Sequence, residues 1–226
     1  MLYIASFDIG TTNVKGLSAG IYAEDIAAIS FSGQMQDCIP VTHEGNPARP
    51  AILYSDSRAA EQAERMNQDL GTPAIRNITG NHLDGTLTFP KILWIKEQEP
   101  EIYQQTSVFL ISAKDYVIRQ LTGRNVTDPT SAATVGVMNV SKRQWESEWL
   151  YRYNIESEKL PVICPSDEIA GHVNEQASKI TGLAAGTPVL CGIGDAGAAT
   201  IGAGVTRCGK GIVYCDRAVN ECWECT

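Results

Sequence analysis

The sequence predicts an α/β fold, and two features of the 226-residue chain indicate it. Apolar runs of the length of buried strands recur along the chain, and segments of helical composition separate them. The main strand candidates are residues 3–7, 26–31, 107–110 and 187–194, and the main helix candidates are residues 57–70, 88–95, 114–121 and 195–204. A chain of this length can bury a real core, as one large domain or as two small ones.

The first elements read as a hairpin. The apolar residues 3–7 run into a tight turn at 8–12, and residues 14–18 are apolar enough to return as a second strand. A buried strand follows at 26–31 and closes at a Ser-Gly pair, residues 32–33.

Residues 39–41 and 51–54 flank the polar residues 42–47, and this pattern predicts a further hairpin. The helices after it have recognisable ends. Prolines at 90 and 100 suit the first turns of two successive helices, and Gly71 and Gly123 suit helix ends.

The C-terminal part begins with a strand that enters a glycine turn at 192–194 and continues as an Ala- and Gly-rich helix. Residues 212–214 predict one last strand, followed by a polar, cysteine-bearing end without a partner. At residues 19–21 the second predicted strand is followed at once by a helix-like segment. This junction leaves too little chain for a sheet of this size to close on itself.

The acidic balance excludes several partners. A net charge of −8 and a pI near 4.9 argue against binding to nucleic acid or to an anionic membrane surface. No apolar run approaches the roughly 20 residues that cross a bilayer, and residues 1–5 lack the basic start of a signal peptide. We therefore expect a cytoplasmic protein.

Seven cysteines are present. Three stand apart in apolar or turn contexts, and the other four crowd the end of the chain: Cys38, Cys164 and Cys191, and then Cys208, Cys215, Cys222 and Cys225. Cys222 and Cys225 have the Cys-x-x-Cys spacing of half a zinc site. Cys208 and Cys215 are separated by six residues, which does not suit the tight turn of the other half. Free thiols in a reducing compartment are the favoured interpretation, and a metal-binding interaction module is the alternative.

The first motif that suggests chemistry is Asp-Ile-Gly-Thr-Thr at 8–12, followed by a lysine. Gly10 permits close approach of an anion, and the hydroxyls of Thr11 and Thr12 can cradle phosphate oxygens. Lys15 adds a positive charge, and Asp8 can hold Mg²⁺ directly or through water. The alternative is a plain hairpin with a surface lysine.

The second motif places Asp195 directly after a glycine turn, at the start of a helix. The positive helix end favours its ionised form, which a general base needs in order to accept a proton from a substrate hydroxyl. The alternative is an aspartate that only caps the helix.

The third motif places amides and charges at strand ends, where α/β folds bind ligands. Gln34, Met35 and Gln36 follow one strand, and Asp56 and Arg58 precede a helix. Such groups suit a polyhydroxylated ligand. Capping by the aspartate and a surface ion pair of the arginine are the alternatives.

Taken together, these motifs resemble those of the FGGY carbohydrate kinases, and within them most closely the xylulokinase branch. The resemblance covers nearly the whole chain to about Gly211. The motifs that carry it occur in family order at 8–12, 32–35, 56–58, 88–94 and 192–195, with further agreement at 99–103, 114–116, 121–123 and 127–128.

The resemblance implies a ribonuclease H-like, actin-type fold of two such domains, with ATP in the cleft between them. Asp8, Gly10, Thr11, Thr12 and Lys15 would then bind the ATP phosphates and Mg²⁺, with Asp8 at the metal. The sugar would lie against the residues of the third motif and against Asp195, which would be the general base.

The chain departs from the family in three respects. Where xylulokinases usually have Ser-Gly-Gln-Met-His-Gly, the motif here ends in Gln36-Asp37, which leaves the substrate open. A family segment of some tens of residues, carrying a third strand and a helix, is absent near 19–21. We expect residues 1–204 to form the N-terminal sugar- and phosphate-binding domain, and residues 205–226 to begin a second, largely absent ATP-binding domain.

Three functions remain in competition at this stage. The first is an ATP-dependent kinase for a xylulose-like ketose, and the second is a kinase for another sugar, a polyol such as glycerol, or an aldonate such as gluconate. The third is a catalytically silent sugar-binding fragment. The sequence leaves the oligomeric state open, a homodimer included.

Overall fold

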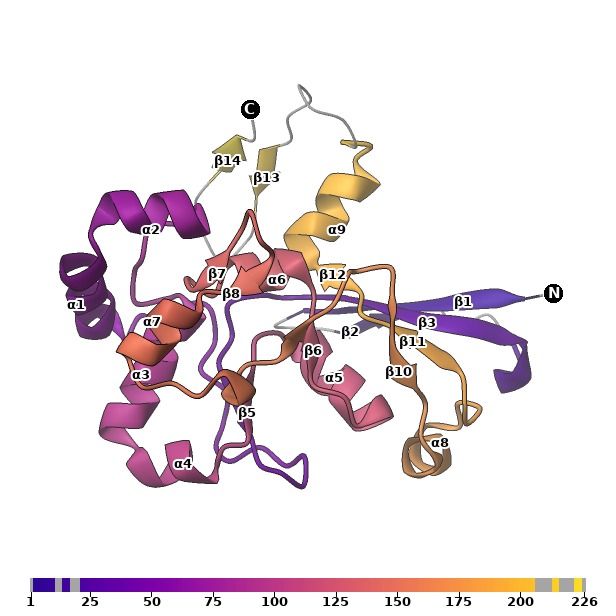
Figure 1. Ribbon diagram of the computed structural model, residues 1–226. Coiled ribbons are helices and arrows are strands. Elements are labelled where there is room, and N and C mark those ends of the chain that lie inside the picture. The colour runs from indigo at the N-terminus through magenta and orange to yellow at the C-terminus, as the bar shows by residue number, and fades with distance from the viewer. Residues whose placement is uncertain (1, 11–13, 17–20, 206–212, 216–221, 225–226) are drawn as a thin grey trace.

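The computed structural model describes residues 2–10, 14–16, 21–205, 213–215 and 222–224 (Figure 1). A six-stranded sheet organises one half of it. The strand order is β10-β11-β3-β1-β2, and β12 also pairs with β3. These strands span Tyr3–Ile9 (β1), Val14–Gly16 (β2), Ile26–Gly33 (β3), Ile169–His172 (β10), Pro188–Leu190 (β11) and Ile193–Gly194 (β12).

The predicted N-terminal hairpin and the parallel strand beside it are confirmed. β1 and β2 are antiparallel, and β3 runs parallel to β1 from Tyr3↔Ile26 to Ile9↔Gly33. The single turn η1 (Ala23–Asp25) directly precedes β3. Because β1, β3 and β12 are parallel, their carboxyl ends lie at one edge of the sheet.

Helices α5 (Ala113–Thr122) and α8 (Glu175–Thr181) cover one face of the sheet, below it in Figure 1. Their apolar side chains pack on the sheet residues Ile29, Phe31 and Val189, all nearly or fully inaccessible to solvent. Helices α6 (Pro129–Ala133) and α9 (Asp195–Gly202) lie on the other side, near the carboxyl ends of the strands. The sheet therefore presents those ends between two sets of helices.

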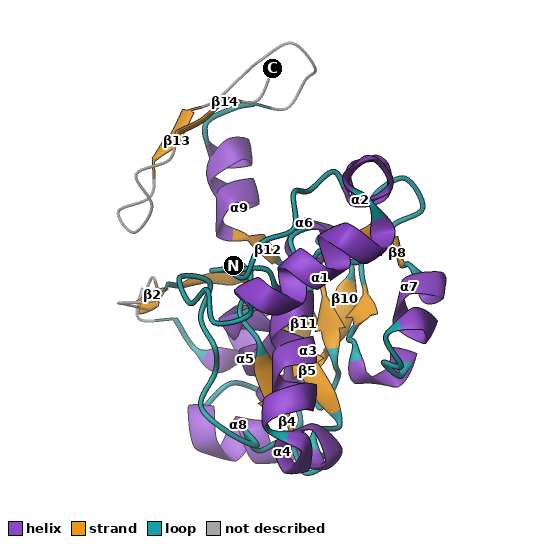
Figure 2. Cartoon of the chain, turned by 90° about the vertical axis from the view of Figure 1, so that its left-hand side faces the viewer, coloured by secondary structure: helices purple, strands orange, loops and turns teal. Residues whose placement is uncertain are grey.

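A helical lobe occupies the other half of the molecule, at the left of Figure 1 and toward the viewer in Figure 2. Phe89, Ile92 and Ile95 lie at its centre with no exposed surface, and Trp149 packs beside them. Its helices are α1 (Ala60–Leu70), α2 (Thr72–Thr79), α3 (Thr88–Gln98), α4 (Pro100–Gln105) and α7 (Ser147–Arg152). Pro90 and Pro100 both fall in first helical turns, as predicted.

The remaining elements are short. They are β4 (Ile39–Val41), β5 (Val108–Leu110), β6 (Val126–Thr127), β7 (Met138–Asn139), β8 (Gln144–Trp145), η2 (Ser157–Lys159), β9 (Val162–Ile163), β13 (Val213–Cys215) and β14 (Cys222–Glu224). Among the described residues, no helix has the length and apolar character that a membrane span requires.

Three sequence predictions were wrong in detail. β4 pairs with β5, which lies far along the chain, while residues 51–54 contribute only an isolated bridge between Cys38 and Ile52. The strand predicted from 187 does enter a glycine turn, at Gly192 with a φ of +70°, but residues 193–194 then pair again with β3 as the short strand β12. The strand predicted near 212–214 does have a partner, since β13 and β14 form an antiparallel pair.

Candidate functional site

The candidate site lies at the edge where β1, β3 and β12 end. Asp8 is opposite Ser32 in the register, and Gly33 is opposite Gly194, so Asp195 follows the strand end on the far side of β3 from Asp8. Adjacent strands are about 4.8 Å apart, which places the two aspartate backbones about 10 Å apart. The two aspartates thus flank the end of β3 at one edge of the sheet.

Asp8 takes part in a hydrogen bond across this edge. The Ser32 hydroxyl donates to Asp8 Oδ1 over 2.7 Å. Since a carboxylate accepts several hydrogen bonds or metal contacts, this bond orients Asp8 and is compatible with a cation at the same group.

Asp195 is the first residue of α9, and Gly194 is the cap residue. Asp195 Oδ1 accepts from the Ala196 N–H over 2.7 Å. Asp195 therefore lies one residue inside the helix rather than at its cap, and the Ala196 amide and the positive helix end hold its carboxylate in a place that suits a general base.

Met35 is in close contact with the turn before Asp195. A Cβ atom added to Gly194 would lie 2.1 Å from Met35 Sδ and 3.3 Å from Ser131 Oγ. A larger residue there would have to displace the Met35 side chain, so the third predicted motif and the base-bearing turn are brought together by direct packing.

Gln34 is buried, and its Nε2 donates to Asp37 Oδ2 over 2.7 Å. Asp37 Oδ1 accepts from the backbone N–H of Tyr54 over 3.2 Å. A carboxylate absent from the usual xylulokinase motif thus links the segment after β3 to the segment that carries Asp56.

Lys91 on α3 makes a second link between these segments. Its buried Nζ donates to the carbonyl oxygens of Gln36, over 2.9 Å, and of Leu53, over 2.8 Å. Gln36 has a φ of +65°, a left-handed conformation that such a fixed carbonyl helps to hold. The structure therefore brings Gln36 and the turn before Asp56 to one lysine.

Arg58 is engaged by its neighbour and by an aromatic ring. Its guanidinium forms a two-pronged pair with Asp56, with Nη2 2.6 Å from Oδ2, and lies 5.0 Å from the centroid of the Trp94 ring. Hydrogen bonding from Arg58 lowers the pKa of Asp56, so this carboxylate is ionised and only accepts hydrogen bonds.

Asp37 and Lys91 have opposite pKa shifts with one shared cause. Burial raises the pKa of Asp37 to about 7, against hydrogen bonds from Gln34 and Tyr54. Burial lowers the pKa of Lys91 to about 8, against the charges of nearby acidic groups that include Asp37 and Asp56. Burial therefore works against the charged form of both groups.

We expect Asp37→Asn to stabilise the protein at pH 8 by about 4 kcal/mol and to change its stability little at pH 4. The folded state keeps the Asp37 proton up to about pH 7, whereas the unfolded chain loses it near pH 4. The folded state therefore binds more protons between these values, and its stability falls as pH rises through them. Asparagine keeps both hydrogen bonds if the Gln34 amide turns over. Urea unfolding of both proteins across pH 4–8 measures the effect. If their free energies of unfolding change in parallel with pH, the raised pKa of Asp37 is contradicted.

Sequence reasoning missed a buried cluster of three charges beside the Asp195 turn. Lys114 Nζ lies 2.7 Å from Asp115 Oδ1 and 3.0 Å from Asp128 Oδ1, and none of the three side chains is exposed. Burial works against the charge of Lys114, but the two carboxylates outweigh it and raise the lysine pKa. Burial raises the pKa of Asp115, whereas Lys114 and Ser131 outweigh burial and lower that of Asp128. The cluster therefore holds a charged Lys114–Asp128 pair.

The predicted phosphate and metal site is described only in part. Gly10 follows β1, whereas Thr11 and Thr12 lie outside the described residues, as does the side chain of Lys15. Asp8 fits Mg²⁺ in chemistry and place, since this ion commonly binds one or two carboxylates together with phosphate oxygens and water. No group of three His, Cys, Asp or Glu side chains converges among the described residues.

The cysteine predictions are confirmed where they can be followed. Cys38, Cys164 and Cys191 are free thiols. Cys208 and Cys225 lie outside the described residues, as do the side chains of Cys215 and Cys222, so the zinc alternative stays a prediction.

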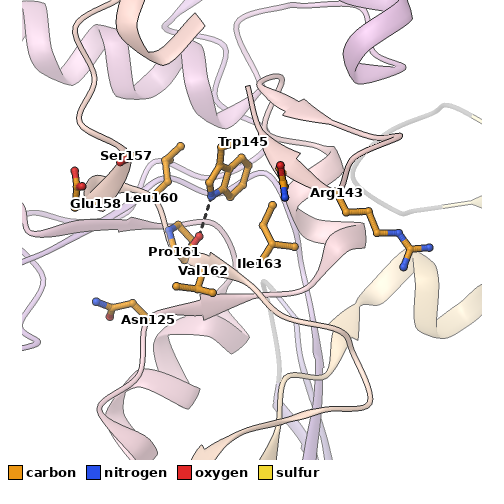
Figure 3. A pocket seen from close by; sticks show the side chains of 10 residues that line it. Asn125, Arg143, Trp145, Ser157, Glu158, Leu160, Pro161, Val162 and Ile163 are labelled. Carbon is orange, nitrogen blue, oxygen red and sulfur yellow. Dashed lines mark hydrogen bonds between the residues drawn. The ribbon is translucent and has the colours of Figure 1, made fainter. Parts of the chain in front are cut away.

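A separate groove of about 580 Å³ contains none of the predicted site residues (Figure 3). Trp145 forms part of its wall and donates from Nε1 to the Pro161 carbonyl over 2.9 Å. Val162, on the same wall, is 68% exposed. The groove is lined by polar and apolar residues in equal number, and it lies apart from the edge where β1, β3 and β12 end.

Comparison with known proteins identifies the relatives of this chain. The model of the FGGY family of carbohydrate kinases, N-terminal domain, matches residues 17–202. A xylulose kinase of Staphylococcus xylosus is 33% identical over 182 residues, which are 80% of this chain and 38% of that protein. An autoinducer-2 kinase of Escherichia coli O9:H4 is 30% identical over 193 residues, covering 84% of this chain and 36% of that protein.

The fold is found in solved structures too. The crystal structure of xylulose kinase from Rhodospirillum rubrum superposes with a TM-score of 0.82 at 23% identity, over 92% of this chain and 52% of that one. The chain spans about two fifths of the length of the curated relatives it matches. The mixed α/β domain thus corresponds to the N-terminal half of these kinases, and the chain belongs to the FGGY family of carbohydrate kinases.

Proposed function

We propose that this chain is the sugar-binding half of an ATP-dependent carbohydrate kinase that phosphorylates a hydroxyl of a xylulose-like pentulose. The observation that carries the proposal is the placement of Asp8 and Asp195 on either side of the β3 end, at one edge of the sheet. One carboxylate can serve the phosphate and its metal while the other serves the sugar hydroxyl.

Asp195 is proposed as the general base. It accepts the proton of the attacking hydroxyl, while the hydroxyl oxygen bonds to the γ-phosphorus and the bond from that phosphorus to the oxygen of departing ADP breaks. The Ala196 amide and the start of α9 favour the charged form of Asp195 that this step requires.

Asp8 is proposed to hold Mg²⁺, with Gly10, Thr11, Thr12 and Lys15 at the phosphates. Family kinases use ATP with Mg²⁺, which neutralises charge on the transferred group. Ser32 contributes by orienting Asp8 through its 2.7 Å hydrogen bond. Catalysis of this kind depends mainly on positioning and charge neutralisation.

The sugar is proposed to lie against Gln34, Met35, Gln36 and the Asp56–Arg58 pair. Asp56 offers acceptors and Arg58 donors, which suits a ligand with a hydroxyl on nearly every carbon. Lys91 donates to the backbone carbonyl of Gln36, and Asp37 accepts from the side-chain amide of Gln34. Their contribution is to fix the pocket rather than to contact the sugar.

The choice of a pentulose rests on the xylulose kinases among the relatives. Gln36 and Asp37 depart from the usual motif of those enzymes, so another ketose, a polyol such as glycerol or an aldonate such as gluconate forms the test panel. ADP release is measured with each compound in the presence and absence of Mg²⁺. The proposal expects Mg²⁺-dependent release with D-xylulose above all others, and a preference for glycerol or gluconate would reassign the substrate.

A second candidate is a sugar-binding protein without turnover. The chain spans about two fifths of the length of its kinase relatives, so sugar binding and turnover are measured separately. Calorimetry separates the two candidates. Binding of D-xylulose with no ADP release would support the second, and release of ADP at any sugar-dependent rate would exclude it.

A further inference from the structure

The buried pair of Lys114 and Asp128 is placed to act on the Asp195 turn. Lys114 is at the start of α5, and Asp128 caps α6, where its Oδ2 accepts from Thr130 N over 2.9 Å. Charges removed from water are costly, and a pair of apolar side chains often stabilises a core equally well. Stability alone is therefore a weak reason for an ion pair at this position.

The pair contacts both ends of the turn between β11 and β12. Lys114 Nζ donates to the Cys191 carbonyl over 3.3 Å, and the Gly194 N–H donates to Asp128 Oδ2 over 3.4 Å. These two contacts enclose Gly192 and Ile193, and Asp195 is the next residue. The turn that leads into the candidate base is thus tied to the buried pair at both of its ends, the second of them directly before Asp195.

Close packing makes this turn sensitive to small shifts. An added Cβ on Gly33 would lie 3.2 Å from Lys114 Cβ, and one on Gly194 would lie 2.1 Å from Met35 Sδ. The lysine stem, the end of β3 and the turn are therefore in direct van der Waals contact. A displacement of the Lys114–Asp128 pair has to move the Gly194–Asp195 peptide.

We propose that Lys114 and Asp128 are positioning residues that set the direction of the Asp195 carboxylate. The inference rests on the proposed function for its catalytic consequence. A shift of about 1 Å in a reacting group can reduce a rate by about a hundredfold. Since the pair does not reach the sugar or the nucleotide, its loss affects kcat more than KM.

The test uses Asp128→Asn and Lys114→Met in the full chain. Asparagine is a good helix cap, so α6 is retained while the charge is lost, and methionine keeps the apolar stem of the lysine. We expect Asp128→Asn to lower kcat at least tenfold with KM changed less than threefold. We also expect the Gly194 amide resonance to move upfield and to exchange faster with solvent.

The double variant separates positioning from stability. Asp128→Asn leaves Lys114 with Asp115 as its one carboxylate partner, and Lys114→Met leaves two buried carboxylates without a cation. Lys114→Met/Asp128→Asn leaves Asp115 alone, and burial raises the pKa of this carboxyl, which favours its uncharged form. The resistance of the double variant to urea should therefore return toward that of the parent protein. The positioning role predicts that kcat stays low in the double variant. Recovery of kcat together with stability would overturn it.

Lys159→Met is the matched control. Lys159 also donates from its Nζ to two backbone carbonyls, of Tyr103 and Thr106, but it lies beneath α4, among residues that take no part in the site. Its loss should change stability without changing kcat or the Gly194 amide. If the parent chain neither binds sugar nor releases ADP, the proposed function fails. The Gly194 amide still tests the inference in that case, because an unchanged resonance in Asp128→Asn overturns it.

Discussion

Asp195→Asn is expected to reduce sugar-dependent ADP release by 10²- to 10⁴-fold, the range typical of a lost general base. Asparagine has the size of aspartate and retains an oxygen that can accept from the Ala196 amide, which lies 2.7 Å from Asp195 Oδ1. The start of α9 should therefore keep its structure. What the variant loses is the ability to take a proton from the sugar hydroxyl.

The control for this variant is Asp69→Asn, an exposed aspartate on α1 in the helical lobe. It should retain parent activity, and both variants should unfold at the same urea concentration as the parent. Calorimetry with D-xylulose adds a second readout, because binding should weaken far less than turnover. Parent-like turnover in Asp195→Asn would show that Asp195 takes no part in the mechanism and only binds the Ala196 amide at the start of α9.

Gly192→Ala is expected to destabilise the protein by more than about 3 kcal/mol, which is exceptional for a substitution this small. Gly192 has a φ of +70°, and an added Cβ would lie 2.1 Å from the Phe31 carbonyl oxygen. Neither atom can move away easily, because Phe31 is in β3 at the centre of the sheet. The methyl group must therefore displace the turn or the strand.

Gly182→Ala is a closely matched control. Gly182 ends α8 with a φ of +77°, but an added Cβ there meets no atom within 4 Å. It has the backbone strain of Gly192→Ala without the clash, and about 1 kcal/mol is the expected cost. Urea unfolding measures both variants. If both variants lose the same free energy of unfolding, the Phe31 carbonyl does not confine the turn at Gly192.

Local patterns were sufficient to predict the elements that lead to the site. The apolar run before Asp8 and the Ser-Gly pair after residue 31 predict β1 and β3, and both strands are found with their ends side by side. Pro90 and Gly123 mark helix ends correctly because each acts on its own backbone. Such signals need no knowledge of distant residues.

Pairing between distant segments was not predictable in this way. β4 has its partner at Val108–Leu110, beyond four helices, and the nearer residues 51–54 have an equally suitable local pattern. The interruption at Gly192 likewise depends on the Phe31 carbonyl, which belongs to a strand far earlier in the chain. Both features are set by tertiary contacts.

The buried charges were missed for a related reason. Lys91, Lys114 and Asp128 each look like surface or capping residues when read singly. One signal was available, since Lys91 lies inside the apolar run 88–95 and Lys114 precedes an acidic neighbour at a helix start. That signal does not show which partners complete the pairs. The roles proposed for Thr11, Thr12 and Lys15 remain predictions.

The most direct test of the central claim is a titration of the ¹⁵N-labelled chain with D-xylulose, followed by amide resonances. The account predicts saturable shifts at the ends of β3 and β12, at residues 33–36 and 194–196, and around Asp56. Gly33 and Gly194 are paired at the edge of the sheet, and Asp56 is connected to the segment after β3 through the bond from Tyr54 N–H to Asp37. An absence of shifts, or shifts confined to the groove beside Trp145, would contradict the account.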